Sequence, residues 1–299
     1  MSERYIGVDV GGTRTKLVLF EAPGTVHERR AVPSRWSSGD EFVASVLAVL
    51  QPWLAPDAGA AVSAVGIGVA GLIDRGGGRL LRAPNLQMLE GFAMVPALRA
   101  ATGLRVEIDN DANAAGLAEA TLGAAAGCST AVCLTVGTGV GGAILQEGRL
   151  WRGHAGMAGE IGRLLLDDEA PSYLEDEVGA AAVVRRYRKA GGAAADDIDA
   201  AAVARRADAG DEAAQQALAH CGRRLGVGLA VLVNLLNPER IVVGGGIAGA
   251  GKWFLDPARR EGEQRAWPLA WEQCEIVAAQ LGADAGAIGA ALLCGRAAR

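Results

Sequence analysis

The hydrophobic positions near the N-terminus predict a small antiparallel sheet. Tyr5–Val10 is a largely apolar run that ends at Gly11-Gly12, Lys16–Phe20 is rich in Val and Leu, and Val26–Val32 alternates apolar and polar residues. Short runs of this kind, separated by turn residues, are typical of β-strands, and the first two would form a hairpin around a glycine turn. Val62–Val69, in which glycine alternates with β-branched residues, predicts a further buried strand.

A similar pattern recurs in the middle of the chain. Val8–Thr13 resembles Leu134–Gly139, because in each segment an apolar strand enters a glycine-rich turn and an apolar strand follows. The two copies are too far apart in the sequence to be units of a solenoid. A duplicated domain built on a β-meander, with a cleft between the copies, accounts for the repeat.

Periodicity predicts that helices alternate with the remaining strands, which is the pattern of an α/β protein. Further strands are predicted at Arg105–Ile108, Thr130–Val136, Gly142–Gln146, Glu239–Val243 and Glu275–Ala279. Helices are predicted at Asp40–Leu50, Pro96–Thr102, Ala112–Leu122, Leu174–Lys189, Ile198–Ala207, Asp211–Leu236 and Asp284–Arg299. With 299 residues, two domains are expected.

The charge and the apolar runs exclude some classes of function. The net charge is −5, which argues against nucleic-acid binding because neutralising phosphates requires a clustered cationic surface. The short basic runs Arg185–Lys189 and Arg205–Arg206 are typical of solvated helix faces. No apolar stretch approaches the roughly 18 residues of a membrane span, and no signal sequence is visible. We therefore expect a cytoplasmic protein with neither nucleic acid nor membrane as a partner.

Three glycine turns are candidates for anion binding. Backbone N–H groups in such turns can converge on a phosphate because no Cβ blocks the approach, although a plain hairpin explains a single turn equally well. Gly137–Gly142 matches the dinucleotide pattern GxGxxG, but that motif requires a following helix and the residues here predict a strand. The sequence contains no Walker A motif.

Two aspartates are candidates for chemistry. Asp9 lies at the end of the first strand, where its carboxylate could hold Mg²⁺ through water or cap the turn. Asp109–Asn113 places two carboxylates and two amides at a helix start, which is more than an N-cap needs. One of these aspartates could accept a proton from a substrate hydroxyl, as a kinase requires.

Taken together, these segments resemble the ROK family (repressors, open reading frames and sugar kinases) over nearly the whole chain. The residues that carry the resemblance are Asp9–Lys16 (first phosphate loop), Gly68–Asp74, Pro84–Leu86, Asn110–Asn113, Thr135–Gly142 (second phosphate loop), Gly156–Gly162 and Gly244–Gly246 (adenosine-side turn).

The resemblance implies a fold and a division of the chain. The fold would be α/β, of the two-domain ASKHA (actin/hexokinase, ribonuclease H-like) type, with a duplicated βββαβα core and a central cleft. Residues 1–111 would form the N-terminal domain, completed by the C-terminal helix 285–299. Residues 112–284 would form the C-terminal domain. The family often dimerises, so a homodimer is expected.

The resemblance also implies a reaction, in which the hydroxyl of a hexose-type sugar is phosphorylated by ATP with Mg²⁺ as cofactor. Asp111 would be the general base, and Asp9 would hold the metal through water. The residues that would bind the sugar or polyol are Asn85, Asn110, Glu160, Arg163 and Glu175. Those that would bind the nucleotide are Asp9, Gly11, Gly12, Thr13, Lys16, Thr138, Gly139, Gly245 and Gly246.

Two departures from the family pattern bear on the substrate. Arg163 stands where the family usually has His, and Leu164–Tyr173 replaces a cysteine-rich zinc segment without any cysteine, so no zinc site is expected. Arg163 would be either a salt-bridged structural residue or a contact to a different substrate, since it is longer than His and permanently charged. In lacking the zinc segment, the chain resembles C7-cyclitol kinases, and this resemblance implies a C7-cyclitol of the valiolone or valienol type as an alternative substrate.

Two non-enzymatic alternatives also follow from the family. A repressor would carry a helix-turn-helix domain ahead of the first strand, which here begins near residue 5. A non-catalytic sugar sensor would bind ligand without consuming ATP. Retention of Asp111 favours the enzyme over both.

Overall fold

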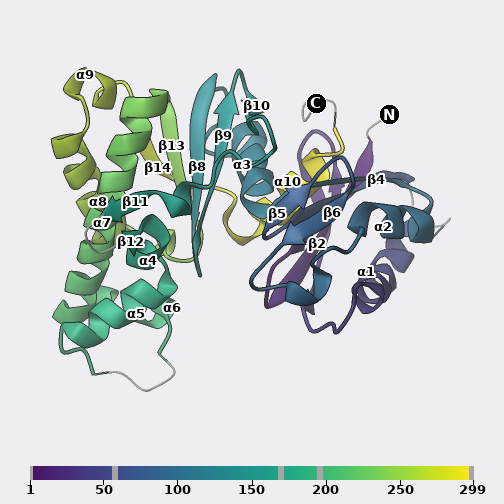
Figure 1. Ribbon diagram of the computed structural model, residues 1–299, viewed down its shortest axis with the longest axis horizontal. Helices are drawn as coiled ribbons and strands as arrows, with labels where there is room; N and C mark the ends of the chain where they lie inside the picture. Colours follow the sequence, from purple (N-terminus) through teal and green to yellow (C-terminus); the bar gives the residue numbers. More distant parts are fainter. Residues whose placement is uncertain (1–2, 56–59, 168–171, 194–197, 296–299) are drawn as a thin grey trace. The chain divides into compact units, whose positions relative to one another are not determined.

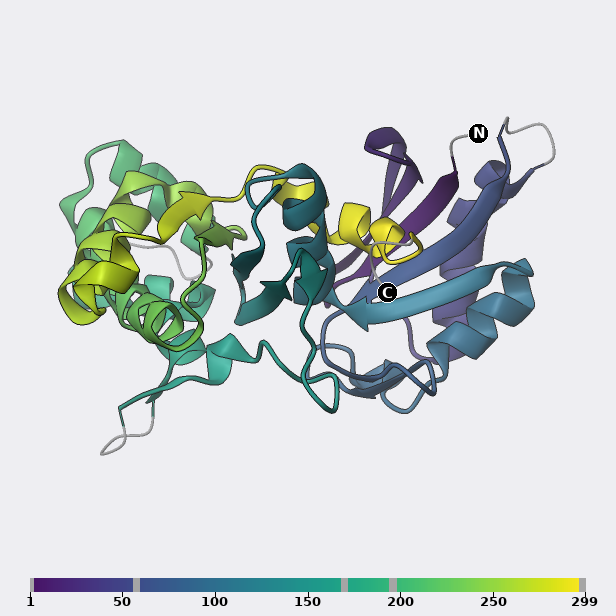
Figure 2. The same cartoon turned by 90° about the horizontal axis from the view of Figure 1, so that it is seen from above.

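The computed structural model describes residues 3–55, 60–167, 172–193 and 198–295. The chain forms two compact units (Figures 1 and 2). Unit 1 comprises Met1–Leu122, Arg149–Ala158 and Asp284–Arg299, and unit 2 comprises Gly123–Gly148 and Gly159–Ala283. The helix that begins at Asp111 therefore packs with unit 1, whereas the division proposed from the sequence assigns it to the second domain. None of the helices in the described part has the length and apolarity of a membrane span.

Unit 1 is built on a five-stranded sheet with the order β3-β2-β1-β4-β7. Strand β1 is antiparallel to β2 and parallel to β4, which is parallel to β7. Its elements are β1 (Arg4–Val10), β2 (Arg14–Glu21), β3 (Thr25–Pro33), α1 (Gly39–Leu54), β4 (Val62–Val69), β5 (Leu72–Asp74), β6 (Arg79–Arg82), η1 (Gln87–Leu89), α2 (Met94–Thr102), β7 (Arg105–Asn110), α3 (Asp111–Leu122), β10 (Arg149–Leu150) and α10 (Ala285–Leu292).

Helix α10 lies closely against the sheet and against α3 in both ribbon views (Figures 1 and 2). Glycine makes this approach possible at three places. A Cβ on Gly7 of β1 would lie 1.9 Å from the carbonyl oxygen of Ala287, and one on Gly289 would lie 1.6 Å from that of Ala114. At Gly66 of β4 a Cβ would lie 1.7 Å from a carbonyl oxygen of the same helix. The end of the chain is thus an integral layer of unit 1.

Unit 2 repeats the strand pattern of unit 1 and adds more helices. Strand β9 is antiparallel to β8, which is parallel to β13, and β13 is parallel to β14. The elements are β8 (Thr130–Val136), β9 (Val140–Gln146), η2 (Ile161–Arg163), β11 (Leu165–Asp167), β12 (Ser172–Tyr173), α4 (Leu174–Val178), α5 (Ala180–Lys189), α6 (Ala200–Asp208), α7 (Glu212–Leu236), β13 (Arg240–Gly244), η3 (Ala248–Ala250), α8 (Lys252–Arg265), α9 (Pro268–Trp271), β14 (Glu275–Ala278) and η4 (Gly282–Asp284), which leads to α10.

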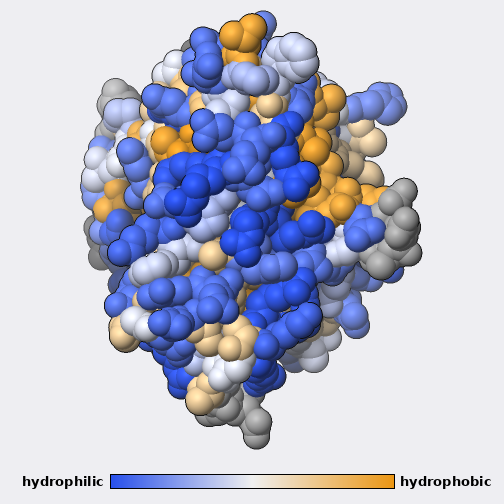
Figure 3. Space-filling model, turned by 90° about the vertical axis from the view of Figure 1, so that its left-hand side faces the viewer, coloured by the Kyte–Doolittle hydropathy of each residue, from blue (hydrophilic) through white to orange (hydrophobic). Residues whose placement is uncertain are grey.

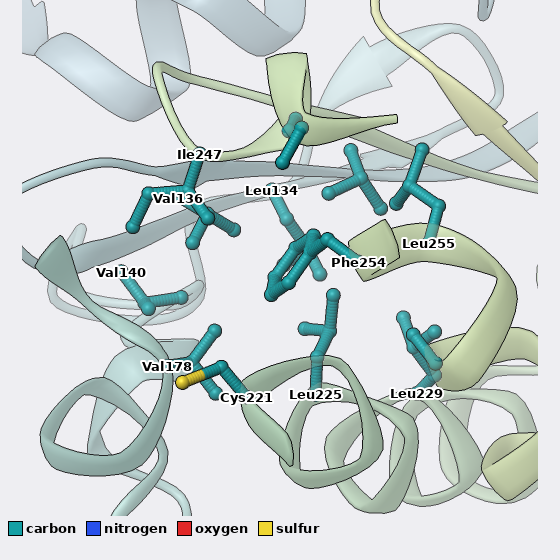
Figure 4. Packing of buried hydrophobic residues seen from close by; sticks show 14 of the residues in the cluster. Leu134, Val136, Val140, Val178, Cys221, Leu225, Leu229, Ile247, Phe254 and Leu255 are labelled. Carbon is teal, nitrogen blue, oxygen red and sulfur yellow. The ribbon is translucent and has the colours of Figure 1, made fainter. Parts of the chain in front are cut away.

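The core of unit 2 lies between its sheet and the helix pair α7 and α8. Figure 4 shows Phe254 of α8 among Leu134 of β8 and Leu225 of α7, all of them fully or almost fully buried. Helices α7 and α8 pack closely because a Cβ on Gly222 would lie 2.2 Å from the carbonyl oxygen of Phe254. The face of this unit seen in Figure 3 is mostly hydrophilic, with separate apolar groups at its edges.

Local signals define the long helix of unit 2. The side chain of Asp211 accepts a hydrogen bond from the N–H of Ala214 at 3.1 Å and so caps the start of α7. The helix ends at Asn237, whose φ of 44° is the left-handed conformation common at helix C-termini. The prediction of a helix over Asp211–Leu236 is therefore confirmed almost to the residue.

Two predicted helices differ from the structure. The segment predicted as one helix, Leu174–Lys189, is divided into α4 and α5 at Gly179, whose extended backbone caps both. A Cβ on Gly179 would lie 2.8 Å from the carbonyl oxygen of Thr138, so the chain approaches the β8–β9 turn closely here. The C-terminal helix α10 ends at Leu292, and residues 296–299 lie outside the described part.

The predicted α/β class and ASKHA fold are confirmed. In both units an antiparallel hairpin is followed by two parallel strands on its first strand, β2-β1-β4-β7 in one and β9-β8-β13-β14 in the other. The equivalent hairpins close around the glycine turns, with Val10 paired to Thr15 and Val136 paired to Val140. The repeat visible in the sequence is thus a repeat of structure.

Candidate active site

In unit 1, the predicted residues gather at one edge of the sheet. Strands β1, β4 and β7 are parallel, so their carboxyl ends meet there. These ends carry Asp9 with the first glycine turn, the Ala70-Gly71 turn, and Asn110 with Asp111. Ligands of open α/β sheets bind outside the carboxyl ends of strands, so the topology favours this edge as the site.

The first glycine turn is exposed and has another predicted segment directly against it. A Cβ on Gly12 would lie 2.9 Å from the Cβ of Asn85, so the loop that contains Asn85 packs on the turn. The N–H of Gly11 donates to the carbonyl oxygen of Arg14 at 3.2 Å, and the carbonyl of Thr13 accepts from the N–H of Ser34. These two bonds hold the backbone on either side of the turn.

The carboxyl group of Asp9 is held in a partly buried place. It is opposite Lys16 across the hairpin, and the helix residue Gly286 packs against it, since a Cβ there would lie 2.7 Å from the Asp9 carboxyl carbon. Burial and the charge of Asp111 raise the pKa of Asp9 to about 6, against the opposing effect of Lys16. A cation beside Asp9 would relieve this penalty on its ionised form.

Asp111 is the first residue of α3. Burial raises the pKa of its carboxyl group above the ordinary value, although the N–H of Ala112 donates to it at 2.9 Å. A raised pKa brings a carboxylate closer to the basicity that a general base needs near neutral pH. The charge of Asp111 acts on the carboxyl group of Asp9, so the metal candidate and the base candidate belong to the same cluster.

Asn110 caps the helix that Asp111 begins. Its Oδ1 accepts hydrogen bonds from the N–H groups of Ala112 at 2.8 Å and Asn113 at 3.3 Å, and its Nδ2 donates to the carbonyl of Gly71 at 3.1 Å. These bonds engage both the oxygen and the nitrogen of the amide, and the NH₂ group has a second N–H beyond the one that donates to Gly71. The side-chain amide of Asn110 therefore provides the cap that was predicted at the start of α3.

In unit 2, two glycine turns lie at the carboxyl ends of adjacent parallel strands. Thr138 and Gly139 follow β8, and Gly245 and Gly246 follow β13. Gly245 has a φ of +88°, and a Cβ there would lie 2.4 Å from the carbonyl oxygen of Val136. Only glycine adopts this conformation and fits this space without strain. This explains why position 245, in the predicted adenosine-side turn, is a glycine.

Glu175 and Arg163 form a cluster beside the β8–β9 glycine turn. The Nη1 of Arg163 donates to Oε1 of Glu175 at 3.2 Å, and its guanidinium lies 3.7 Å from the centre of the Tyr173 ring. A Cβ on Gly139 would lie 3.1 Å from Oε2 of Glu175. Glu160 is exposed at the start of η2, where its carbonyl accepts from the N–H of Arg163 at 3.1 Å.

The carboxylates of Asp9 and Asp111 suit a hard cation better than a soft one. No group of three or more His, Cys, Asp or Glu suited to a metal ion occurs among the described residues. Asp9 offers carboxylate oxygens in a place where burial penalises its charge. Mg²⁺ typically uses one or two carboxylates together with substrate phosphates and waters, so the donor set fits Mg²⁺ held with a nucleotide.

Comparison with known proteins agrees with this fold. The ROK family profile matches residues 5–297. A glucokinase from Halalkalibacterium halodurans is 34% identical over 97% of this chain and 94% of its own. An N-acetylmannosamine kinase from Escherichia fergusonii is 33% identical over 96% of this chain and 97% of its own.

Among solved structures, a ROK family glucokinase from Streptomyces griseus in complex with glucose and AMPPNP superposes with a TM-score of 0.85 at 30% identity, covering 97% of this chain and 98% of that one. The two ribonuclease H-like units with glycine turns at the sheet edges define the ASKHA class. Within this class, the chain belongs to the ROK family.

Some residues of the site were not predicted from the sequence. Gly286 packs against the carboxyl group of Asp9, where a larger side chain would not fit. In the sequence, this close packing is indicated by nothing more than the Ala- and Gly-rich segment Ala285–Ala291 of the last helix. Asp109 belongs to the predicted carboxylate cluster, but its partner Arg152 lies 43 residues away and carries no local signal.

Proposed function

We propose that this protein is a kinase that transfers the γ-phosphoryl group of ATP to a hydroxyl of a hexose-type sugar. One observation carries the proposal: Asp111 lies at the carboxyl end of β7, in the same cluster as Asp9, and burial raises its pKa. A base of raised pKa beside a metal-holding carboxylate is the pair that hydroxyl phosphorylation needs. The sugar kinases among the relatives support the same reaction.

In the proposed mechanism, Asp111 accepts the proton of the sugar hydroxyl. The oxygen of that hydroxyl attacks the γ-phosphorus, the bond from that phosphorus to the bridging oxygen breaks, and ADP leaves with the electron pair. Asp9 would hold Mg²⁺ through water, and this cation would neutralise charge on the phosphates. The N–H groups of Gly11, Gly12 and Thr13 would bind phosphate oxygens, and Lys16 would add positive charge.

In unit 2, the turn at Thr138 and Gly139 would bind phosphate, and Gly245 and Gly246 would contact the adenosine. Glu160 and Glu175 would accept hydrogen bonds from sugar hydroxyls, and in unit 1 Asn85 and the remaining N–H of Asn110 would orient others. The complex of a glucokinase relative with glucose and AMPPNP, an ATP analogue, supports ATP as the donor. Use of ATP and a free sugar would place the activity in the cytoplasm.

The ion pair of Arg163 with Glu175 favours a second candidate substrate. With Arg163 on one of its oxygens, Glu175 has less capacity for sugar hydroxyls than a free carboxylate has. Because Arg163 stands where the family usually has His and is held on Glu175, the polar groups offered to the substrate differ from the family pattern, and a C7-cyclitol is the alternative acceptor. A sensor that binds sugar without transferring phosphate is the lesser alternative.

A substrate panel tests the proposal. ADP release is measured with glucose, mannose, N-acetylmannosamine and valienol-type cyclitols as acceptors, each with ATP and Mg²⁺, and the product is identified by mass and NMR. We expect one hexose to be turned over best. Turnover confined to a cyclitol would favour the alternative, and sugar binding in calorimetry with no ADP release from any acceptor would favour the sensor.

We also propose a homodimer. In unit 2, Leu235 at the end of α7 is 73% exposed, and Trp267 and Leu269 next to it are each 69% exposed. The N–H of Trp267 donates to Oδ1 of Asn234 at 2.8 Å, so the two segments adjoin. A second copy packed on Leu235, Trp267 and Leu269 would remove these apolar side chains from water.

Light scattering tests the dimer. The wild type should have twice the mass of one chain, and Trp267→Asp should have the mass of a single chain. A monomeric wild type would contradict the proposal.

A further inference from the structure

A buried ion pair lies directly before the base in unit 1. Asp109 is 2% exposed, and its Oδ2 accepts a hydrogen bond from Nε of Arg152 at 2.7 Å. The side chain of Arg152 is itself only 14% exposed. The nearest further cation is Arg75, whose Nε lies 3.5 Å from the same oxygen and whose side chain is 40% exposed. Arg152 is therefore the principal counter-ion of this carboxylate.

The other oxygen of Asp109 holds the residues on both sides of Asp111. Its Oδ1 accepts from the backbone N–H of Asn110 at 2.8 Å and from Nδ2 of Asn113 at 2.9 Å. Asn110 in turn caps α3. The direction in which α3 leaves the sheet, and with it the place of Asp111, depends on these bonds.

Arg152 comes from a separate part of the chain. The segment Arg149–Ala158 follows the β8–β9 hairpin of unit 2 in sequence but packs with unit 1. Its Arg152 also donates from Nη1 to the carbonyl of Leu150 at 3.4 Å, which ties the guanidinium to the end of the preceding strand β10. A buried carboxylate that loses its partner is strongly destabilised, so Asp109 would reorganise without Arg152.

We propose that Arg152 is a positioning residue for phosphoryl transfer: through Asp109 it fixes Asn110 and Asn113, and thereby the carboxylate of Asp111. This inference rests on the proposed role of Asp111 as the base. Arg152 does not touch the reacting atoms in this scheme, and its contribution is to the geometry of the step. Loss of that geometry lowers kcat, because a displacement of about 1 Å in a reacting group can cost about 100-fold.

Four variants test the proposal: Arg152→Met, Asp109→Asn, the double variant of the two, and Arg149→Met as the matched control. Arg149 is an exposed arginine in the same segment. We expect Arg152→Met to lower kcat about 10- to 100-fold, with the KM for ATP changed by less than about threefold, and Arg149→Met to change neither. An unchanged kcat in folded Arg152→Met would overturn the proposal.

The double variant separates positioning from charge balance, and it keeps the test valid if Arg152→Met does not fold. It leaves no buried charge unpaired, so its melting temperature should return toward that of the wild type. Its kcat should stay low: the amide oxygen of residue 109 can still accept from Asn110 and Asn113, but without the bond from Arg152 the orientation of that side chain is no longer fixed. Recovery of kcat together with stability would overturn the proposal, since Arg152 would then only balance charge.

Amide exchange distinguishes a failure of this inference from a failure of the proposed function. In the ligand-free protein, exchange of the Ala112 and Asn113 amides, which donate to Asn110, should be at least about tenfold faster in Arg152→Met than in wild type or Arg149→Met. This result would uphold the structural link even if the wild type phosphorylated no acceptor. Unchanged exchange at these amides would overturn it.

Discussion

Asp111→Asn should reduce kcat for sugar phosphorylation about 10²- to 10⁴-fold while the protein remains folded. Asparagine keeps the size of the side chain and can still accept the hydrogen bond from the N–H of Ala112, but it cannot take the proton of the sugar hydroxyl. The KM values for sugar and ATP should change far less than kcat, because the base acts mainly in the transition state.

The pH dependence of the wild type gives a second measure of the same group. A base must be ionised, so kcat/KM should fall as the pH is lowered through the pKa of Asp111. Because burial raises this pKa, the decline should be centred above the ordinary value of 3.8 for an aspartate.

The matched control for this substitution is Asp40→Asn, which changes an exposed aspartate at the start of α1 in the same unit. It should leave kcat and its pH dependence unaltered. If Asp111→Asn kept more than about a tenth of the wild-type kcat, the role of general base would have to be given up.

The strands and turns of the site were largely predictable from the sequence. Each glycine turn follows a short run of apolar, β-branched residues, and such local patterns are set by backbone sterics and the two-residue period of a strand. The strand Thr130–Val136 was predicted with the bounds that the structure has. Because the turns at Gly11 and Gly139 are local, their position at strand ends could be derived before any tertiary contact was known.

Tertiary contacts account for what was missed. Helix α8 contains Pro257, which removes a helical N–H and argues against a helix in local terms. The helix nevertheless forms, since its backbone packs at Gly222 and Gly226 of α7, where a Cβ would lie 2.2 and 2.6 Å from carbonyl oxygens of α8. Packing of this kind outweighs propensity and has no signature in the local sequence.

Tertiary contacts also explain why the site could be predicted only in part from the sequence. Asp9 and Asp111 could be singled out as carboxylates at element boundaries, but the effect of Asp111 on the pKa of Asp9 depends on the adjacency of β1, β4 and β7. The contact of Gly286 with Asp9 joins the two ends of the chain. Residue type and spacing describe neighbours along the chain, so they predict neither the electrostatic effect of Asp111 on Asp9 nor the contact of Gly286 with Asp9.

Asp9→Asn should lower kcat and at the same time stabilise the protein in the absence of divalent cations. The loss of activity should be about 10- to 100-fold, the effect typical of removing a carboxylate that holds a metal through water. The gain in stability follows from the pKa of Asp9, which is about 6 in the folded chain and ordinarily 3.8. The folded state thus disfavours the ionised carboxylate that the unfolded state accepts.

The sign and the pH range of this gain follow from proton linkage. Below the unfolded pKa both states bind the proton and the wild type bears no penalty. As the pH rises through 3.8 toward the folded pKa of about 6, only the unfolded state loses its proton, so the free energy of unfolding falls. Above that range the penalty is complete, and a pKa difference of about 2 corresponds to at most about 3 kcal/mol, less screening by solvent at this partly exposed side chain.

Chemical denaturation of wild type, Asp9→Asn and the control Asp40→Asn, with EDTA present, measures this gain. The free energy of unfolding of Asp9→Asn should exceed that of the wild type, and the excess at about pH 8 should be roughly twice that at about pH 5. Asp40→Asn should show no such pH-dependent excess. A loss of stability in Asp9→Asn at about pH 8 would contradict this prediction. It would mean that favourable contacts stabilise the ionised Asp9 in the metal-free protein, and that burial and the charge of Asp111 do not penalise it.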